Sequence, residues 1–486
     1  MIATVLLIPV VTALMCFLVR NRRAVEYISV LGVVALAASA VPRINASLSA
    51  PEYFMGGALF MDALSAYMMA VVVFIAFVTA LYSFDYMGRE FEEGVITLGE
   101  LRYYYGLFHL FLFTMLLVTV ANNLAVFWIA IEGTTLVSAL LVGFYKSRQS
   151  IEAAWKYIIL CTVGITFALL GVFVTYYASV SVTGGRGTLN WTELRDLASR
   201  LNPSTMKLAF ILILIGYGTK AGLAPVHNWL PDAHSQAPTP ISALLSSILL
   251  KCAFIGIVRF VIILNGSAGP SYAGRLLLIF GLLSMGIATA FILLQNNYKR
   301  LLAYHSIEHI GIIATGMGIG GFLGIYGSLL HILNHAVVKA LLFFTTGQVR
   351  RRYHSTKIEK VRGAITLLPV SGAVMLLAAL AIAGAPPFNI FVSEFIILKA
   401  AAEGGNWVTF ALFLGFATII FGGVVHHFGD MAFGKPQVTH EARKGEGRLA
   451  AIVIVVMAAI MLMLGLYIPS FVERLLSGSL RVIMGG

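Results

Sequence analysis

Runs of about 20 apolar residues recur along the whole chain, and this pattern limits the possible folds more than any other feature. A helix of roughly 20 apolar residues spans the hydrocarbon core of a bilayer. Of the 486 residues, 59% are hydrophobic and only 11% are charged, whereas an average soluble domain has about 25% charged residues. A soluble globular fold is therefore excluded, and we expect an all-α, polytopic membrane protein.

Polar or Gly/Pro-rich residues separate the apolar runs and predict about 14 transmembrane helices. The first run, MIATVLLIPVVTALMCFLV, has no basic leader and no clear A-x-A cleavage site, so we expect a retained helix rather than a signal peptide. The expected ranges are 2–19, 24–41, 59–84, 103–120, 123–145, 156–180, 205–230, 240–264, 274–295, 301–319, 323–347, 365–402, 408–429 and 449–468.

Prolines interrupt two of these helices inside the apolar zone. Pro225 breaks the seventh helix, and Pro386 with Pro387 breaks the twelfth. The breaks lie five helices apart, as two inverted five-helix repeats require; two independent packing kinks are the alternative. The resulting division is N-terminal helices in 1–102, a first repeat in 103–264, a second repeat in 274–429, and a C-terminal loop and helix in 430–486.

The basic residues indicate the orientation, because Lys and Arg gather in cytoplasmic loops. Most of the 33 basic residues fall in inner loops if the N-terminus is outside, so we expect both termini outside. The net charge of +12 then reflects topology rather than nucleic-acid binding. The outer side keeps a small group: Arg43, Arg186, Arg195, Arg200, Lys207, Arg275, Arg474 and Arg481.

Three charged residues in the first repeat are expected near the middle of the membrane. Glu132 lies about 14 Å into its helix and Lys251 about 16 Å into its own, at 1.5 Å per residue, and Lys220 stands five residues before Pro225. Such charges are costly in a bilayer and usually mark ion pathways. We predict a proton site formed by Glu132 close to Lys220; a static ion pair that joins helices is the alternative.

The second repeat carries a comparable set in HILNHAVVKALLFF. His331, His335 and Lys339 are spaced by four residues and share one helix face. Imidazoles titrate near neutral pH and can pass protons between groups, although a lone buried histidine is more often a packing residue. Glu394 and Lys399 follow the second break, and we expect them at the outer end of a proton path.

Two further segments have ambiguous patterns. The string HSIEH contains His305, Glu308 and His309 and matches the H-x-x-E-H metalloprotease pattern, but its apolar helix offers no evident room for a peptide. We interpret it as a proton-handling group or a polar packing cluster.

The turn NWLPDAHSQAPTP contains His227, Asp232 and His234. It fits either a proton-uptake funnel or a helix-capping turn.

The cysteines do not form a binding pattern. Cys16, Cys161 and Cys252 lie in apolar stretches without a CxxC motif, so we expect no disulfide, no iron–sulfur cluster and no zinc site. The sequence predicts no cofactor and no metal in this chain, and electron chemistry would belong to other subunits.

Four long strings resemble the antiporter-like membrane subunits shared by respiratory complex I, Mrp-type sodium/proton antiporters and group 4 membrane-bound nickel–iron hydrogenases. They are GYGTKAGLAPVHNWLPDAHSQAPTPISALL, KRLLAYHSIEHIGII, HILNHAVVKALLFF and GAPPFNIFVSEFIIL. The resemblance implies that the family's pathway residues are Glu132, Lys220, Lys251, His331, His335 and Lys339. Its ionisable position on helix 12 is Glu or Lys, and here Glu394 matches the Glu form while Lys399 lies nearby.

The strings YHSIEHIGII, LNWTELRDLASRLNP and GAPPF are most similar to the F-type subunits of hydrogenase-4 and formate hydrogenlyase complexes. This resemblance implies a proton-translocating subunit of a membrane redox complex in a prokaryotic plasma membrane. Its expected partners are other membrane subunits, nickel–iron hydrogenase and iron–sulfur subunits, lipid, and H⁺ with Na⁺ as the alternative ion. An Mrp-type Na⁺/H⁺ antiporter subunit and a membrane scaffold are the rival functions.

Overall fold

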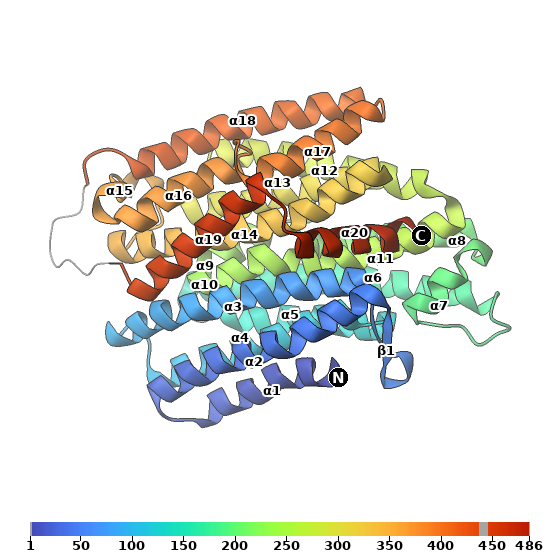
Figure 1. Ribbon diagram of the computed structural model, residues 1–486, viewed down its shortest axis with the longest axis horizontal. Coiled ribbons are helices and arrows are strands. Elements are labelled where there is room, and N and C mark those ends of the chain that lie inside the picture. The colour runs from blue at the N-terminus through green and yellow to red at the C-terminus, as the bar shows by residue number, and fades with distance from the viewer. Residues whose placement is uncertain (1, 437–445, 486) are drawn as a thin grey trace.

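The computed structural model describes residues 2–436 and 446–485 as an elongated bundle of helices (Figure 1). The first half contains α1 (Ile2–Leu18), α2 (Arg22–Ser49), β1 (Glu52–Phe54), β2 (Leu59–Met61), α3 (Ala63–Glu92), α4 (Leu98–Val120), α5 (Leu124–Val142), α6 (Arg148–Val180), α7 (Trp191–Asp196), α8 (Pro203–Ala221), α9 (Leu230–Gln236), α10 (Thr239–Leu244) and α11 (Leu250–Ala268). The second half contains α12 (Pro270–Leu293), α13 (Tyr298–Ile319), α14 (Gly321–Tyr353), α15 (Ala364–Leu367), α16 (Pro369–Ile382), α17 (Asn389–Glu403), α18 (Trp407–Ala432), α19 (Arg448–Leu466) and α20 (Ser470–Met484).

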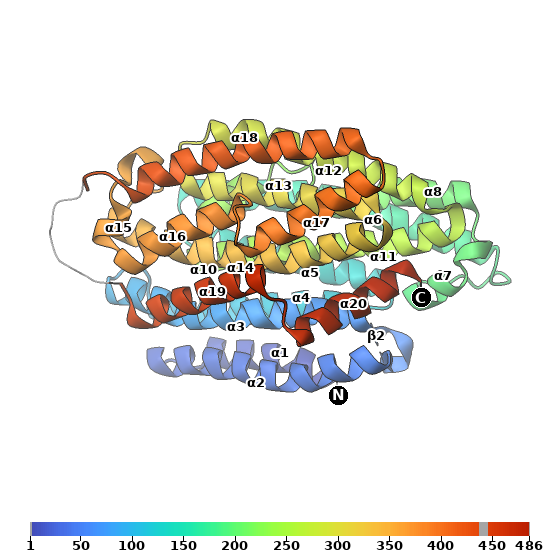
Figure 2. The same ribbon diagram turned by 45° about the horizontal axis from the view of Figure 1, so that its top comes forward.

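The helices form layers whose centre is much more buried than its edges. Helices α1 and α2 lie along one side of the bundle and α18 along the opposite side (Figure 2). In the most apolar part of α14, 94% of the residues are buried, and the same holds for 239–268, whereas the value for α18 is 28%. The central helices therefore offer the sheltered positions in which ionisable side chains can contact one another.

A helix occupies each of the 14 expected ranges, which confirms the all-α membrane class. Among the described residues, ten helical segments are long and apolar enough to cross a membrane. Helices α1 and α16 are apolar but shorter. The count of 14 spans stays a prediction, as does the outside position of both termini.

Both predicted helix breaks are present. Helix α8 ends at Ala221 and α9 begins only at Leu230, while α16 ends at Ile382 and α17 begins at Asn389. Freed backbone groups at bilayer depth need polar partners. In the first break, the backbone N–H of Ala224 donates to Ser284 Oγ at 2.9 Å, and the indole N–H of Trp229 donates to the Thr219 carbonyl at 2.8 Å.

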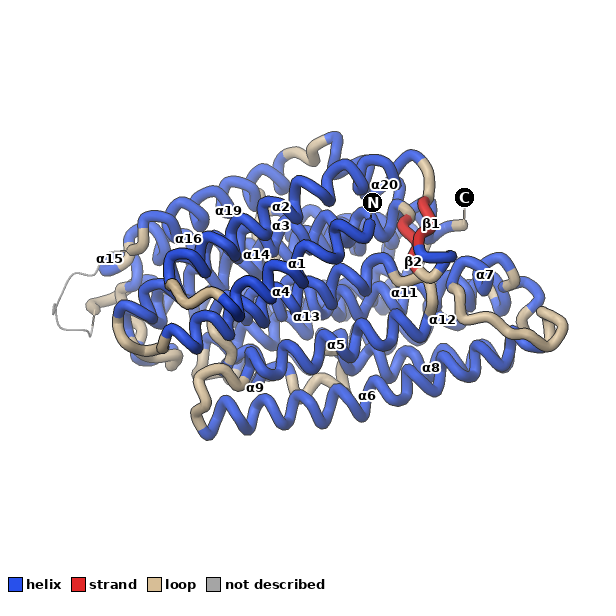
Figure 3. The backbone as a smooth tube through the Cα atoms, turned by 90° about the horizontal axis from the view of Figure 1, so that it is seen from below, coloured by secondary structure: helices blue, strands red, loops and turns tan. Residues whose placement is uncertain are grey.

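Several elements were not expected from the sequence, among them the short helix α7, and Figure 3 shows two others near one end of the bundle. One is the antiparallel hairpin of β1 and β2, in which Glu52 pairs with Met61. The other is α20, whose buried residues include Leu476, Leu480 and Ile483 at helical spacing, with Arg474 and Arg481 exposed. Residues 437–445, which include Arg443 and Lys444 of the expected inner loop, lie outside the described residues.

Candidate functional site

The Lys220 side chain lies at the first helix break, in the last turn of α8. Gly222 follows with a φ of +85°, a left-handed conformation that ends the helix. The fully buried ammonium donates to Thr135 Oγ1 at 2.8 Å and to Tyr157 Oη at 2.6 Å. Its Nζ also lies 4.7 Å from the centroid of the Tyr157 ring. The surroundings of Lys220 are thus hydroxyl groups and aromatic rings.

Glu132 forms no ion pair with Lys220 in the described part of the chain, so the predicted proton site of these two residues stays a prediction. Glu132 Oε1 accepts from Thr162 Oγ1 of α6 at 2.8 Å, and the two described residues make no ion pair with each other. Thr135, the partner of Lys220, stands one helical turn after Glu132 on α5. One hydroxyl partner of Lys220 therefore comes from the same helix as Glu132.

The turn with the two histidines and Asp232 connects helices at the expected inner side. Asp232 lies in the first turn of α9, contacts Arg300 of α13 and lies 3.5 Å from Lys156 of α6. His234 is buried, and its Nδ1 lies 2.9 Å from the Leu230 carbonyl. Asp232 thus links α9 to cations on α6 and α13, which goes beyond a local cap.

Lys251 lies two residues after the end of a short π-helical segment, Leu245–Leu249. Such segments loosen the normal hydrogen-bond ladder and frequently occur at functional sites. Lys251 Nζ donates to the Ser246 carbonyl at 2.6 Å and lies 2.5 Å from His335 Nδ1 of α14. The irregular backbone therefore supplies one partner, and the predicted histidine stripe supplies the other.

Three buried imidazoles continue from Lys251 through the bundle. The centroids of the His335 and His309 rings are 4.7 Å apart. His309 Nδ1 lies 2.8 Å from His331 Nε2, and His331 Nδ1 lies 2.9 Å from Ser393 Oγ of α17. All three histidines have no exposed surface, so α11, α14, α13 and α17 share one polar chain.

Glu394, in the second turn of the helix that follows the second break, ends this chain. One nitrogen each of His309 and His331 and one oxygen of Glu394 lie within 4.8 Å of one another. A Cβ at Gly384, where φ is +77°, would collide with the Glu394 carboxylate. Reciprocal bonds between Asn334 and Asn389, at 2.6 Å and 3.3 Å, hold the start of α17 against α14. The break thus fixes the position of Glu394.

His309 belongs to this row of buried side chains, although the sequence interpretation did not place it there. It comes from the HSIEH segment of α13, in which His305 Nδ1 lies 2.7 Å from Glu308 Oε2. These residues are buried. The sequence feature that could have indicated His309 is its four-residue spacing from His305, which puts both histidines on the face of α13 that meets α14.

The last two predicted site residues, Lys339 and Lys399, differ in burial. Lys339 is buried and contacts the Leu302 carbonyl of α13, close to the chain. The side chain of Lys399 is 52% exposed and its Nζ lies 3.7 Å from Glu403. The structure therefore brings Lys339 to the buried helices but leaves Lys399 on the surface.

Two overlapping groups have the residue types of a metal site: His305, Glu308 and His309, and His309, His331 and Glu394. Zinc uses histidine and carboxylate ligands of these kinds. His309 Nδ1 and His331 Nε2 are engaged with each other at 2.8 Å, and all these residues are buried. The arrangement suits proton exchange between neighbours and gives no groove for the peptide of a metalloprotease.

The fold and this chain define a class: a multi-pass helical membrane protein with a buried row of ionisable side chains and two broken helices. Residues 121–421 match the family described as "NADH:quinone oxidoreductase/Mrp antiporter, TM". Residues 54–94 match "NADH-Ubiquinone oxidoreductase (complex I), chain 5 N-terminus". The chain belongs to this antiporter-like family.

Individual relatives agree with this assignment. The chain is 39% identical to a hydrogenase-4 component F homolog of Methylacidiphilum infernorum over 79% of its own length and 80% of the relative. A chain of the membrane-bound sulfane sulfur reductase, an archaeal respiratory membrane complex, has a TM-score of 0.86 at 26% identity, covering 99% of this chain and 98% of the other. A chain of the Mrp complex from Dietzia sp. shares the fold, with a TM-score of 0.84 at 20% identity and coverage of 98% and 96%.

Proposed function

We propose that this chain translocates protons as a subunit of a membrane-bound redox complex. The supporting observation is the row Lys251–His335–His309–His331–Glu394. From Lys251 to His331 the neighbouring groups lie within hydrogen-bond or ring-contact distance, and a Glu394 oxygen lies within 4.8 Å of nitrogens of His309 and His331. Imidazoles accept and release protons near neutral pH, so such a row can pass a proton along by short steps. Lys220 and Glu132 form the loading end, and Glu394 forms the release end.

The loading end suits control by a neighbouring subunit. Glu132 is only partly buried within this chain, whereas Lys220 is fully buried. A change in charge or packing beside Glu132 would alter the field at Lys220 across one helical turn, because electrostatic interactions are strong at low dielectric. Electron transfer in a partner would thereby change the proton affinity of the loading end.

The proposed partners are other membrane subunits and a peripheral module with nickel–iron and iron–sulfur centres. The relatives named for hydrogenase-4 support this choice. We also propose the prokaryotic plasma membrane as the location, with both termini outside, and the repeats 103–264 and 274–429 as the two halves of the pathway.

Purification of the tagged chain from its own membranes tests the function. Co-elution of nickel- and iron-containing subunits, with proton uptake into proteoliposomes during electron transfer, is the expected result. An Mrp-type exchanger, which the shared fold keeps as the second candidate, would elute only with small membrane subunits and exchange Na⁺ for H⁺ without electron transfer. That outcome would overturn the proposal.

A further inference from the structure

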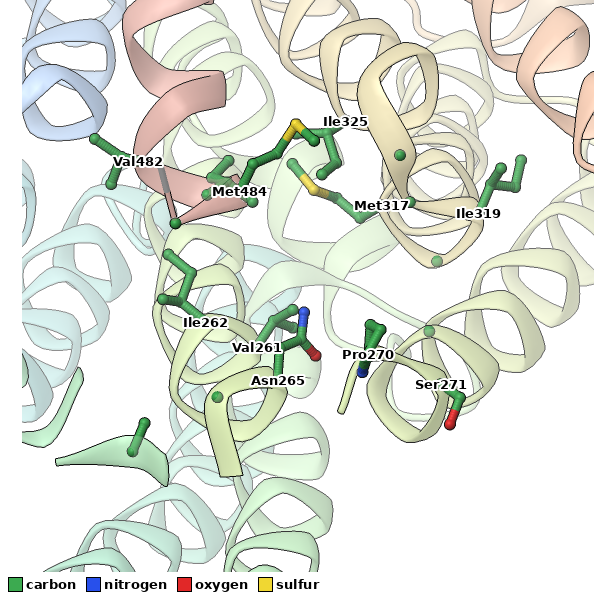
Figure 4. Close-up of a pocket in the computed structure, with 18 of the residues that line it drawn as sticks. Val261, Ile262, Asn265, Pro270, Ser271, Met317, Ile319, Ile325, Val482 and Met484 are labelled. Carbon is green, nitrogen blue, oxygen red and sulfur yellow. The ribbon is translucent and has the colours of Figure 1, made fainter. Parts of the chain in front are cut away.

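A large cavity, lined by none of the residues of the proposed proton row, lies where the ends of α11, α12 and α13 meet α20. Its volume is about 1100 Å³, at or above the upper end of ordinary ligand pockets, which are roughly 300–1,000 Å³. Figure 4 shows Met317, Ile325 and Met484 on one wall, with Val261 and Ile262 opposite. The cavity thus offers a wide apolar surface at the ends of helices that are long enough to cross the membrane.

Cationic side chains line the same cavity. Arg195, Arg275 and Arg481 contribute to the wall, and Asp196 is the acidic residue among the described lining residues. Asp196 is engaged by Arg195 at 2.9 Å. Within residues 2–436 and 446–485, Arg275 and Arg481 make no ion pair, although Arg275 Nε donates to the Ser271 carbonyl at 3.3 Å. The cavity therefore carries uncompensated positive charge.

These arginines belong to the small basic group that the sequence analysis assigned to the outer side. Basic residues are uncommon on that side of a membrane protein, so three of them around one cavity call for a local reason. Arg481 also lines a second cavity of about 620 Å³ with Glu473, Arg474 and Ser477 of α20. The polar face of α20 is consequently directed at the region of these two cavities.

An unsatisfied amide gives a further indication of a ligand. Asn265 lines the cavity, and its Oδ1 atom is buried without a hydrogen-bond partner among the described residues. A buried polar atom without a partner is costly. A ligand that combines an anionic group, a hydroxyl donor and apolar chains would satisfy the arginines, the amide and the apolar walls together.

We propose that this cavity binds an anionic phospholipid with a hydroxylated headgroup, such as phosphatidylglycerol. The phosphate would lie between Arg275 and Arg481, a headgroup hydroxyl would donate to Asn265, and the acyl chains would lie along α11, α12 and α20. The apolar walls and the position at the ends of membrane helices favour a lipid over a free phosphate ion.

The test uses the full chain in its complex, purified in mild detergent, with bound phospholipid measured by mass spectrometry. We expect phosphatidylglycerol to be retained in the wild type and reduced about 25-fold in R275Q/R481Q. Each arginine then contributes about fivefold, the factor that corresponds to about 1 kcal/mol. R186Q changes an exposed arginine of the same side and is the matched control; equal retention in R275Q/R481Q and the control would overturn the proposal.

The variant N265D and a comparison of phosphatidylglycerol with inorganic phosphate complete the test. N265D keeps the side-chain size and both arginines but adds a negative charge, so it should also lose the lipid. Added phosphatidylglycerol should raise the Tm of the delipidated complex, whereas inorganic phosphate at the same concentration should not. An equal rise with inorganic phosphate, or a photo-crosslinker at Ile319 that captures another protein subunit instead of lipid, would contradict the proposal.

Discussion

The two buried lysines of the path have different surroundings. Lys220 is held by the hydroxyl groups of Thr135 and Tyr157, whereas Lys251 contacts the imidazole of His335 and a backbone carbonyl. A hydroxyl group does not take up a proton near neutral pH, but an imidazole does. The comparison teaches that, within the proposed path, the surroundings of Lys220 suit holding a proton, whereas those of Lys251 suit passing it to the imidazoles of the second half.

The largest effect is expected from the replacement of Lys220, the residue proposed to hold a proton. Lys220→Ala removes the buried ammonium, so proton translocation should fall to the passive leak of the vesicles, with slower coupled electron transfer. Proteoliposomes that contain the intact complex provide the measurement. Lys207→Ala, on the same helix but near its other end, is the control; normal pumping by assembled Lys220→Ala complex would contradict the holding role.

Glu394→Gln should have the next largest effect. The change keeps the side-chain volume but removes the titratable group, so we expect translocation to fall at least tenfold, about 1.4 kcal/mol on the limiting step. A carboxylate that only balances a buried cation would instead destabilise the complex by about 3–5 kcal/mol when neutralised. Complex yield and proton uptake per electron, measured on one preparation, separate these outcomes; low yield with normal uptake means a structural role.

Tyr157→Phe should give a smaller loss. The ring that faces Lys220 remains, but the ammonium loses one of its two hydroxyl partners. Removing a hydrogen bond to a charged group costs about 1.5–3 kcal/mol, only part of which falls on the limiting step, so we expect translocation to fall about threefold. Tyr217→Phe is the control, because the Tyr217 hydroxyl is buried without a partner in the described part of the chain; equal rates for the two variants would refute the contact's importance.

Lys399→Gln should have the smallest effect. Its half-exposed side chain lies beside Glu403 and away from the buried row. We expect less than about a twofold change in proton uptake, since exposed ion pairs contribute little. A loss as large as that of Glu394→Gln would show that Lys399 serves as the release group and that the path leaves the chain elsewhere.

The sequence predicted those features that depend on local patterns. Apolar runs located the helices, and prolines located both breaks, because each rule concerns neighbouring residues. The four-residue spacing also put His331 and His335 on one helix face. Contacts between distant segments were harder: the lack of an ion pair between Glu132 and Lys220 depends on which way α5 and α8 turn towards each other.

The role of His309 illustrates the same limit. Its spacing from His305 marked a polar stripe on α13, but only the packing of α13 against α14 places His309 between His335 and His331. Helix α20 was missed for another reason. Its apolar residues alternate with polar ones along an amphipathic segment, so it does not form the continuous apolar run by which membrane helices are found.

The central claim is that protons cross the second half through the buried imidazoles, and His309→Gln tests it most directly. Glutamine keeps a polar side chain of similar reach but cannot carry a proton, and His426→Gln on the exposed face of α18 is the control. Proton uptake per electron should be measured in proteoliposomes with equal amounts of assembled complex. We predict a loss of at least tenfold for His309→Gln and no change for the control; normal uptake in assembled His309→Gln complex would contradict the claim.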